Sequence, residues 1–339
     1  MSRNLISLSL TASLFAGTAL ADVPAVAADI GPVHSLVARV MANVGEPDLI
    51  VAPGASPHEY SLRPSEAQAL QDAEFVFWTG PELTPWLGDA VRTLASGAEV
   101  ITLSDLDATK TLPTRESALF EAHDHGDHDP DHEEGHDHEE HVESERDQHD
   151  HDHEHEHDHA EGHVHGGTDP HIWLSPANAS AWLTVIADTL SAADPDNAEA
   201  YAANAAAGRE ELAALSQEIE GILDPVRGKN FIVFHDAYQY FEDSFGVPAS
   251  GAVSLSDASD PSPARIAEIQ ARVAELDVTC VLSEPQYSPG VVAAVMEGSD
   301  TQTGVLDPLG SDLAPGPALY PQVLRNLASA LADCLRAPQ

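Results

Sequence analysis

Four residues able to bind a metal share one kind of setting in this chain. His58, His171, His235 and Asp307 each lie at the end of an expected strand or in a Pro-flanked turn before a helix. Ligands of open α/β sheets bind at the carboxyl ends of the strands. The spacing places two of the four in each half of the chain. We therefore expect them to meet in a cleft between the halves.

Imidazole and carboxylate groups suit a tetrahedral zinc site, whereas a manganese site would contain more oxygen. Taken singly, a His at a strand end is more often a capping or hydrogen-bonded residue, and Asp-Pro is also a common turn opener. Three His in matching settings favour the ligand interpretation. His34 has no such setting and is interpreted as structural. Asp236 is a candidate acceptor for the ring N–H of a neighbouring His.

A long stretch of His and acidic residues interrupts the chain between His58 and His171. Residues 121–168 contain 15 of the 19 His, together with 19 Asp or Glu and one Arg. Because almost nothing in it is apolar, we predict a disordered loop. His suits zinc, copper and nickel. The alternating His favour a metal-collecting loop over a solvated acidic spacer.

The first 21 residues have the pattern of a secretory signal peptide. Arg3 precedes an apolar run at 5–20, and a small-x-small cleavage site ends at Ala21. The run is short for a membrane anchor, so the mature protein is expected to be exported to the periplasm and not embedded in the membrane. We also expect a monomer. A formal net charge of -43 makes nucleic acid an implausible partner.

The chain has two Cys, Cys280 and Cys334. An isolated pair in an oxidising compartment usually forms a disulfide, and this one would close a long C-terminal loop. Two buried free thiols are the alternative that remains open at this stage.

Strand and helix patterns alternate in both halves, which predicts α/β lobes with mostly parallel sheets flanked by helices. Residues 195–223 predict one long helix, because good helix formers surround apolar residues at helical spacing. We expect an N-terminal lobe at 22–192, a linking helix at 193–225 and a C-terminal lobe at 226–339. Strands are expected at 48–52, 74–78, 99–103, 230–234, 247–253, 278–282 and 303–306, and helices at 32–44, 82–94, 177–191, 263–276, 288–298 and 320–335, with a further helix opening at Ser65 as N-cap.

Four segments resemble the signature segments of ZnuA-type proteins, the periplasmic zinc-binding components of zinc ABC importers. They are PHEYSLRPS at 57–65, DPHIWLSP at 169–176, VFHDAY at 233–238 and LDPLG at 306–310. The resemblance spans the mature chain in order and includes the His-rich loop, the long helix and the Cys pair. It implies two lobes joined by one rigid helix, with zinc between them.

The resemblance also implies a ligand set, namely His58, His171 and His235, with Asp307 at the position of the second-lobe carboxylate. Manganese-binding relatives carry Glu where this chain has His235, so the third His favours zinc. Some zinc-binding members have Glu where this chain has Pro57. The fourth ligand is therefore Asp307 or water.

These features predict a zinc receptor that captures Zn²⁺, delivers it to an ABC permease and performs no catalysis. A stiff linking helix should limit lobe closure, so that docking on the permease drives release. One alternative is a periplasmic zinc hydrolase, since three His and an open position also suit catalysis. Its general base could only be Glu59, and no HExxH motif occurs. The other alternative is a plain metal buffer, with many weak sites and no tight one.

Overall fold

The computed structural model describes residues 23–115, 117, 120, 167–254, 262–287, 289–297 and 301–336. The predicted signal peptide lies outside these residues. The predicted His-rich loop also lies outside them, except for Gly167 and Thr168.

The first of two parallel sheets lies in the N-terminal half. The elements are β1 (Val26–Ala28), α1 (Gly31–Val40), β2 (Asp48–Leu49), α2 (Pro64–Asp72), β3 (Phe75–Trp78), α3 (Pro85–Leu94) and β4 (Glu99–Thr102). The strand order is β2-β1-β3-β4, with all neighbours parallel. Phe75 and Phe77 pack on the side of α1, whereas Val76 packs with α2 and α3. Helices therefore bury both faces, as the alternation of strands and helices predicts.

The second parallel sheet has the same design in the C-terminal half. The elements are β5 (Phe231–His235), α6 (Gln239–Phe245), β6 (Gly251–Ser254), α7 (Pro263–Glu275), β7 (Cys280–Ser283), α8 (Pro289–Val295), β8 (Gln302–Val305) and α9 (Leu319–Arg336). The strand order is β6-β5-β7-β8, again all parallel. Ile232 and Phe234 pack with α7 and α8, while Phe231 and Val233 face the core that contains α9. The predicted fold class is confirmed.

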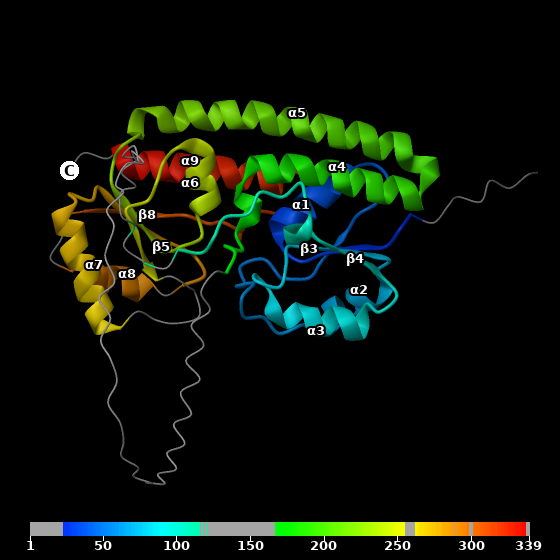
Figure 1. Cartoon of the computed structure of the whole chain (residues 1–339), viewed down its shortest axis with the longest axis horizontal. Coiled ribbons are helices and arrows are strands. Elements are labelled where there is room, and N and C mark those ends of the chain that lie inside the picture. Colours follow the sequence, from blue (N-terminus) through cyan, green and yellow to red (C-terminus); the bar gives the residue numbers. More distant parts are fainter. Residues whose placement is uncertain are drawn as a thin grey trace, which may run out of the picture.

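Long helices run along one side of both sheets. They are α4 (Pro176–Ala193), α5 (Ala198–Leu223) and α9. Figure 1 shows α5, the longest with 26 residues, extending across both halves above α4 and α9. One continuous cluster of buried side chains includes Val26 of β1, Leu212 of α5 and Leu282 of β7. The two halves therefore share a hydrophobic core, and separating them would expose apolar surface to water.

Three elements differ most from the sequence prediction, and β6 begins at Gly251 instead of the predicted residue 247. Strand β1 and helix α6 were not predicted, because Val-Ala-Ala is short and small and because α6 has only seven residues. Helix α2 begins at Pro64 with Arg63 as N-cap, so the prediction of Ser65 as N-cap is wrong. Pro lacks an N–H and suits the first helical position. The N3 residue Glu66 accepts a hydrogen bond from the Arg63 N–H at 2.7 Å.

The predicted disulfide is present between Cys280 at the start of β7 and Cys334 in α9, with a Cα–Cα distance of 5.9 Å. Gly304 of β8 lies against it. A Cβ at that glycine would come within 3.3 Å of the Cys334 sulfur and 3.0 Å of Leu282. The close approach of β8 to the disulfide therefore depends on the missing side chain of Gly304.

Candidate metal centre

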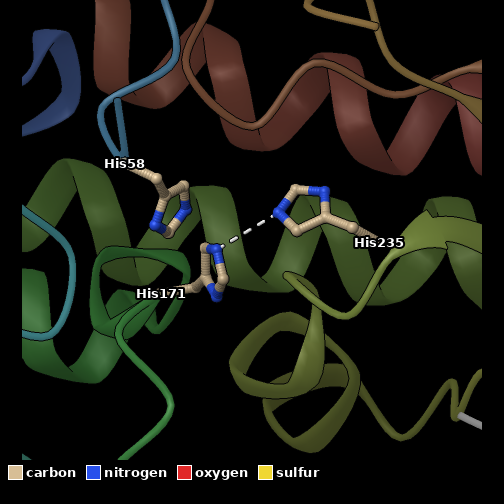
Figure 2. A group of neighbouring side chains, drawn as sticks. All are labelled: His58, His171 and His235. Atoms are coloured by element: carbon tan, nitrogen blue, oxygen red, sulfur yellow. Dashed lines mark hydrogen bonds between the residues drawn. The ribbon is translucent and has the colours of Figure 1, made fainter. Parts of the chain in front are cut away.

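Three His side chains from distant parts of the chain converge between the two halves. His58 lies in the turn between β2 and α2, His171 just before the 3₁₀ turn Ile172–Leu174 that leads into α4, and His235 at the end of β5. Figure 2 shows the three rings facing one another. Their centroids are 5.1, 5.5 and 6.3 Å apart. The structure therefore brings together the three His predicted from the sequence.

The spacing of the ring nitrogens suits a shared ion. His171 Nε2 and His235 Nε2 are 3.3 Å apart. Zinc binds imidazole nitrogen at about 2.0–2.1 Å, so two ligands in a tetrahedron lie about 3.3–3.4 Å apart. One ligand nitrogen of each ring, His58 included, lies within 4.8 Å of the others. His58 is the most exposed of the three.

Two buried carboxylates determine which nitrogen carries the proton in two of these rings. Asp169 Oδ1 lies 2.8 Å from His171 Nδ1, and Glu284 Oε1 lies 2.7 Å from His235 Nδ1. When these carboxyl groups are ionised they can only accept, so each neutral ring then carries its proton on Nδ1. The two Nε2 atoms lie 3.3 Å apart, within hydrogen-bond distance of each other. A shared proton can join them as a hydrogen bond, and a metal ion bound to both nitrogens can take its place.

The same carboxylates hold the backbone of the two His. Asp169 Oδ1 accepts from the His171 N–H at 3.0 Å, and Glu284 Oε1 accepts from the His235 N–H at 3.4 Å. Glu284 follows β7, the neighbour of β5, so it reaches His235 across adjacent strand ends. Such partners outside the ligand shell orient metal-binding His and raise their basicity.

The prediction that Asp236 orients a His ring is wrong. Asp236 accepts from Arg115 Nη1 at 2.7 Å, and the other end of the same guanidinium contacts Glu242 at 2.7 Å. Sequence reasoning missed Asp169 and Glu284 in this role. Asp169 could have been suggested by its place two residues before His171. Glu284 could not, because its partner depends on the order of strands in the sheet.

The turn that carries His58 is held by aromatic side chains. Trp86 of α3 donates from Nε1 to Pro57 O at 2.7 Å, and the ring of Tyr60 lies 5.6 Å from that of Trp86. The Tyr60 hydroxyl in turn donates to Glu66 at 2.7 Å. These contacts between the turn and α3 therefore position His58 in the site, and Trp173 and Tyr287 are among the other side chains that line the pocket.

Asp307 does not belong to the group of His, Cys, Asp and Glu that, among the described residues, can hold one ion. Its Oδ1 accepts from Leu309 N and Gly310 N at 3.1 and 3.0 Å. Its Oδ2 accepts from Ser311 N and Oγ at 2.6 and 2.5 Å. Gln286, which lines the pocket, also donates to Oδ1, at 3.2 Å. Asp307 thus stabilises a turn beside the site, and its role as fourth ligand stays a prediction.

His34 lies outside the cluster, in α1. It is buried, and its Nε2 lies 3.0 Å from Pro47 O. Burial lowers the pKa of its ring. This setting agrees with the structural role predicted for it.

Known proteins of similar sequence include components of zinc uptake systems. Residues 26–334 match the family described as ZnuA, zinc-uptake complex component A periplasmic. A high-affinity zinc uptake system protein ZnuA from Paracoccus denitrificans is 50% identical over 98% of both chains. The protein of that name from Brucella abortus is 47% identical over 98% of this chain and 99% of its own.

A solved structure of lower sequence identity has the same fold. The solute-binding protein FpvC of Pseudomonas aeruginosa, in complex with Mn²⁺, superposes with a TM-score of 0.71 at 18% identity, over 92% of this chain and 98% of its own. Within the residues that the structure describes, no helix combines the length and the apolar character needed to cross a membrane.

We predict that replacing His58, His171 or His235 by Ala weakens tight zinc binding by about 100-fold or more, because a tetrahedral site cannot lose an imidazole without losing a bond. Competition with a high-affinity chelator measures the change. His34→Ala is the matched control, since it removes a buried His outside the cluster, and its affinity should equal that of the wild type. Asp307→Ala in the same series distinguishes a carboxylate from water as fourth ligand. Any of the three His whose removal leaves the affinity intact is not a ligand.

Zinc affinity should fall by at least about tenfold between pH 7 and pH 5, because imidazoles with a reference pKa of ~6.5 must lose their protons to bind. Burial raises the pKa of Asp169 to about 7, so this carboxyl also gains a proton over the range and no longer compensates the charge of the ion. Both changes weaken binding as the pH falls. Titrations at several pH values, corrected for protonation of the chelator, measure the slope. A flat profile would contradict a His-dominated site.

Proposed function

Because this chain belongs to the ZnuA family of periplasmic zinc-uptake components, we propose that it is a receptor that captures Zn²⁺ and delivers it to an ABC permease. One observation carries the proposal. Two imidazoles, each held by a buried carboxylate at Nδ1, direct their Nε2 atoms at each other across 3.3 Å. This arrangement is suited to binding a cation. The proposed ligands are His58, His171 and His235, with Asp307 or water as the fourth.

Charge balance supports a dication at this position. A buried charge is costly unless an opposite charge lies close to it. Asp169 and Glu284 are 2% and 4% exposed and together carry two negative charges when ionised. They compensate Zn²⁺ bound to three neutral rings. The nitrogen-rich ligand set favours zinc over manganese, which prefers oxygen; the fold itself also occurs in a protein that binds Mn²⁺.

The shared core supports release by docking. Opening the cleft by a wide hinge would break the buried cluster that connects both halves through α5. A smaller movement is available at His58, which lines the pocket and is partly exposed. We propose that contact of a monomeric receptor with the permease displaces this turn and frees the ion, with the two halves remaining together.

The His-rich insertion is proposed to collect additional zinc and raise its concentration near the cleft. Its 15 His and 19 acidic residues supply many metal donors. The described segments on either side of it pair with each other, and Asp169 next to them contacts His171.

No observation favours the hydrolase alternative. The family is a component of zinc uptake and not an enzyme. Glu59, the candidate general base, is exposed, and the buried carboxylates of the site are hydrogen-bonded to His rings.

In cells, replacing the gene by one that encodes His171→Ala should prevent growth in medium depleted of zinc by a chelator, because the site can no longer load. Added zinc should restore growth, and added manganese should not. Zinc accumulation of wild-type, His171→Ala and His34→Ala strains measures the effect. Equal uptake in all three strains would contradict the proposed function.

Deleting residues 121–166 should leave one tight zinc site and remove the additional weaker ions, because the three proposed cleft ligands lie outside the deletion. Loop closure changes by ~0.6 kcal/mol per halving of the loop, and this deletion is about three halvings, so the apo protein should be more stable by at most about 2 kcal/mol. Calorimetric titration of the deletion variant beside the full mature chain measures both classes of site. Loss of the tight site with the insertion would make the insertion the primary receptor. Many weak ions and no tight one in either protein would indicate a plain buffer.

A further inference from the structure

The two chain segments that flank the His-rich insertion are paired with each other. Thr114 N donates to Gly167 O and Asp169 N donates to Leu112 O, both at 2.9 Å, and Pro113 forms an antiparallel bridge with Thr168. We call residues 112–115 and 167–169 the neck. Gly167 and Thr168, predicted as the end of the loop, therefore belong to the neck.

One hydroxyl group joins both strands of the neck to the C-terminal half. Tyr240 Oη accepts from Leu112 N at 2.8 Å and donates to Asp169 O at 2.9 Å. Tyr240 belongs to α6 and is 1% exposed. Since Leu112 precedes the insertion and Asp169 follows it, this contact joins the chain segments on both sides of the insertion.

Other contacts from the same region of the C-terminal half support this attachment. Arg115 in the neck forms ion pairs with Asp236 and Glu242, and Lys110 just before the neck contacts Asp243 at 2.6 Å. All three acidic residues follow His235 in the turn after β5 or in α6. The neck is therefore anchored to the element that directly continues from a proposed zinc ligand.

Asp169 connects the neck to the metal centre. Its backbone carbonyl accepts from Tyr240, while its carboxylate accepts from the Nδ1–H and the backbone N–H of His171. A shift of the neck away from α6 would carry Asp169 with it and turn the His171 ring. His235 lies on the other side, only five residues before Tyr240.

We propose that Tyr240 is a positioning residue for the metal centre. By holding the neck against α6, its hydroxyl keeps Asp169 in place and His171 facing His235, so that the insertion leaves the body without disturbing the site. This inference rests on the proposed zinc-binding function, and it concerns a residue that would not touch the ion.

Tyr240→Phe tests the proposal, because it removes the hydroxyl and retains the ring. Tyr201→Phe is the matched control. Tyr201 is also fully buried, and its hydroxyl donates to Asp194 at 2.9 Å, in the α4–α5 region away from the neck. Each full mature protein would be measured for zinc affinity by chelator competition and for stability by urea unfolding without metal. Co²⁺, whose visible absorption reports its coordination geometry, serves as a spectroscopic probe.

We expect Tyr240→Phe to weaken zinc binding by about tenfold, the lower end of the effect of removing partners that orient metal ligands, and to change the Co²⁺ spectrum. Tyr201→Phe should lower stability alone and leave affinity and spectrum as in the wild type. If Tyr240→Phe keeps wild-type affinity, or if both variants lose affinity equally, the proposal is overturned. A wild-type protein without a tight site would instead contradict the proposed function itself.

A second variant covers the case in which Tyr240→Phe does not fold. Arg115→Lys keeps a positive charge beside Asp236 and Glu242 but cannot contact both carboxylates with a fixed fork. It loosens the neck at a different point, so zinc affinity should fall in the same direction by a smaller factor. Unchanged affinity in a folded Arg115→Lys protein would overturn the role of the neck.

Discussion

The pairing of two buried carboxylates with two imidazoles determines the chemistry of the centre. Asp169 and Glu284, when ionised, accept from the Nδ1 atoms of His171 and His235, so the Nε2 atoms that face each other can share a proton or bind a metal ion. They also supply the negative charge that a dication needs when water is largely excluded. The ligands alone would leave both ring orientation and charge undecided. The rest of the site must be arranged so that both hydrogen-bonded pairs stay intact.

Topology explains how residues so far apart reach one ion. Each half places the carboxyl ends of its parallel strands towards the other half, which is the usual location of ligands in such sheets. Glu284 reaches His235 because β7 pairs with β5, although other elements separate these strands in the sequence. The long helices then fix the distance between the two sheets through one shared core. The relative positions of the three His therefore depend on the packing of both halves.

Much of this organisation is visible in the sequence. Alternating strand and helix patterns give the two parallel sheets, and the Ala-rich run with Leu at helical spacing gives α5. The three His are identifiable by their common strand-end setting. The orienting carboxylates are harder to assign, because the sequence places Asp236 beside His235, whereas the fold directs it to Arg115. The three-residue β1 is also hidden, since its small side chains are suited to the centre of a covered sheet and show no pattern of their own.

The paired neck has a consequence for how such a chain can change over time. Because its two strands are already joined to each other and to α6, the backbone on either side does not depend on what is inserted between them. Insertions and deletions at this point should be selected for their metal content and not for compatibility with the fold. The same point would accept a foreign peptide or a small reporter domain. A reporter inserted there would be joined to the chain beside the zinc pocket.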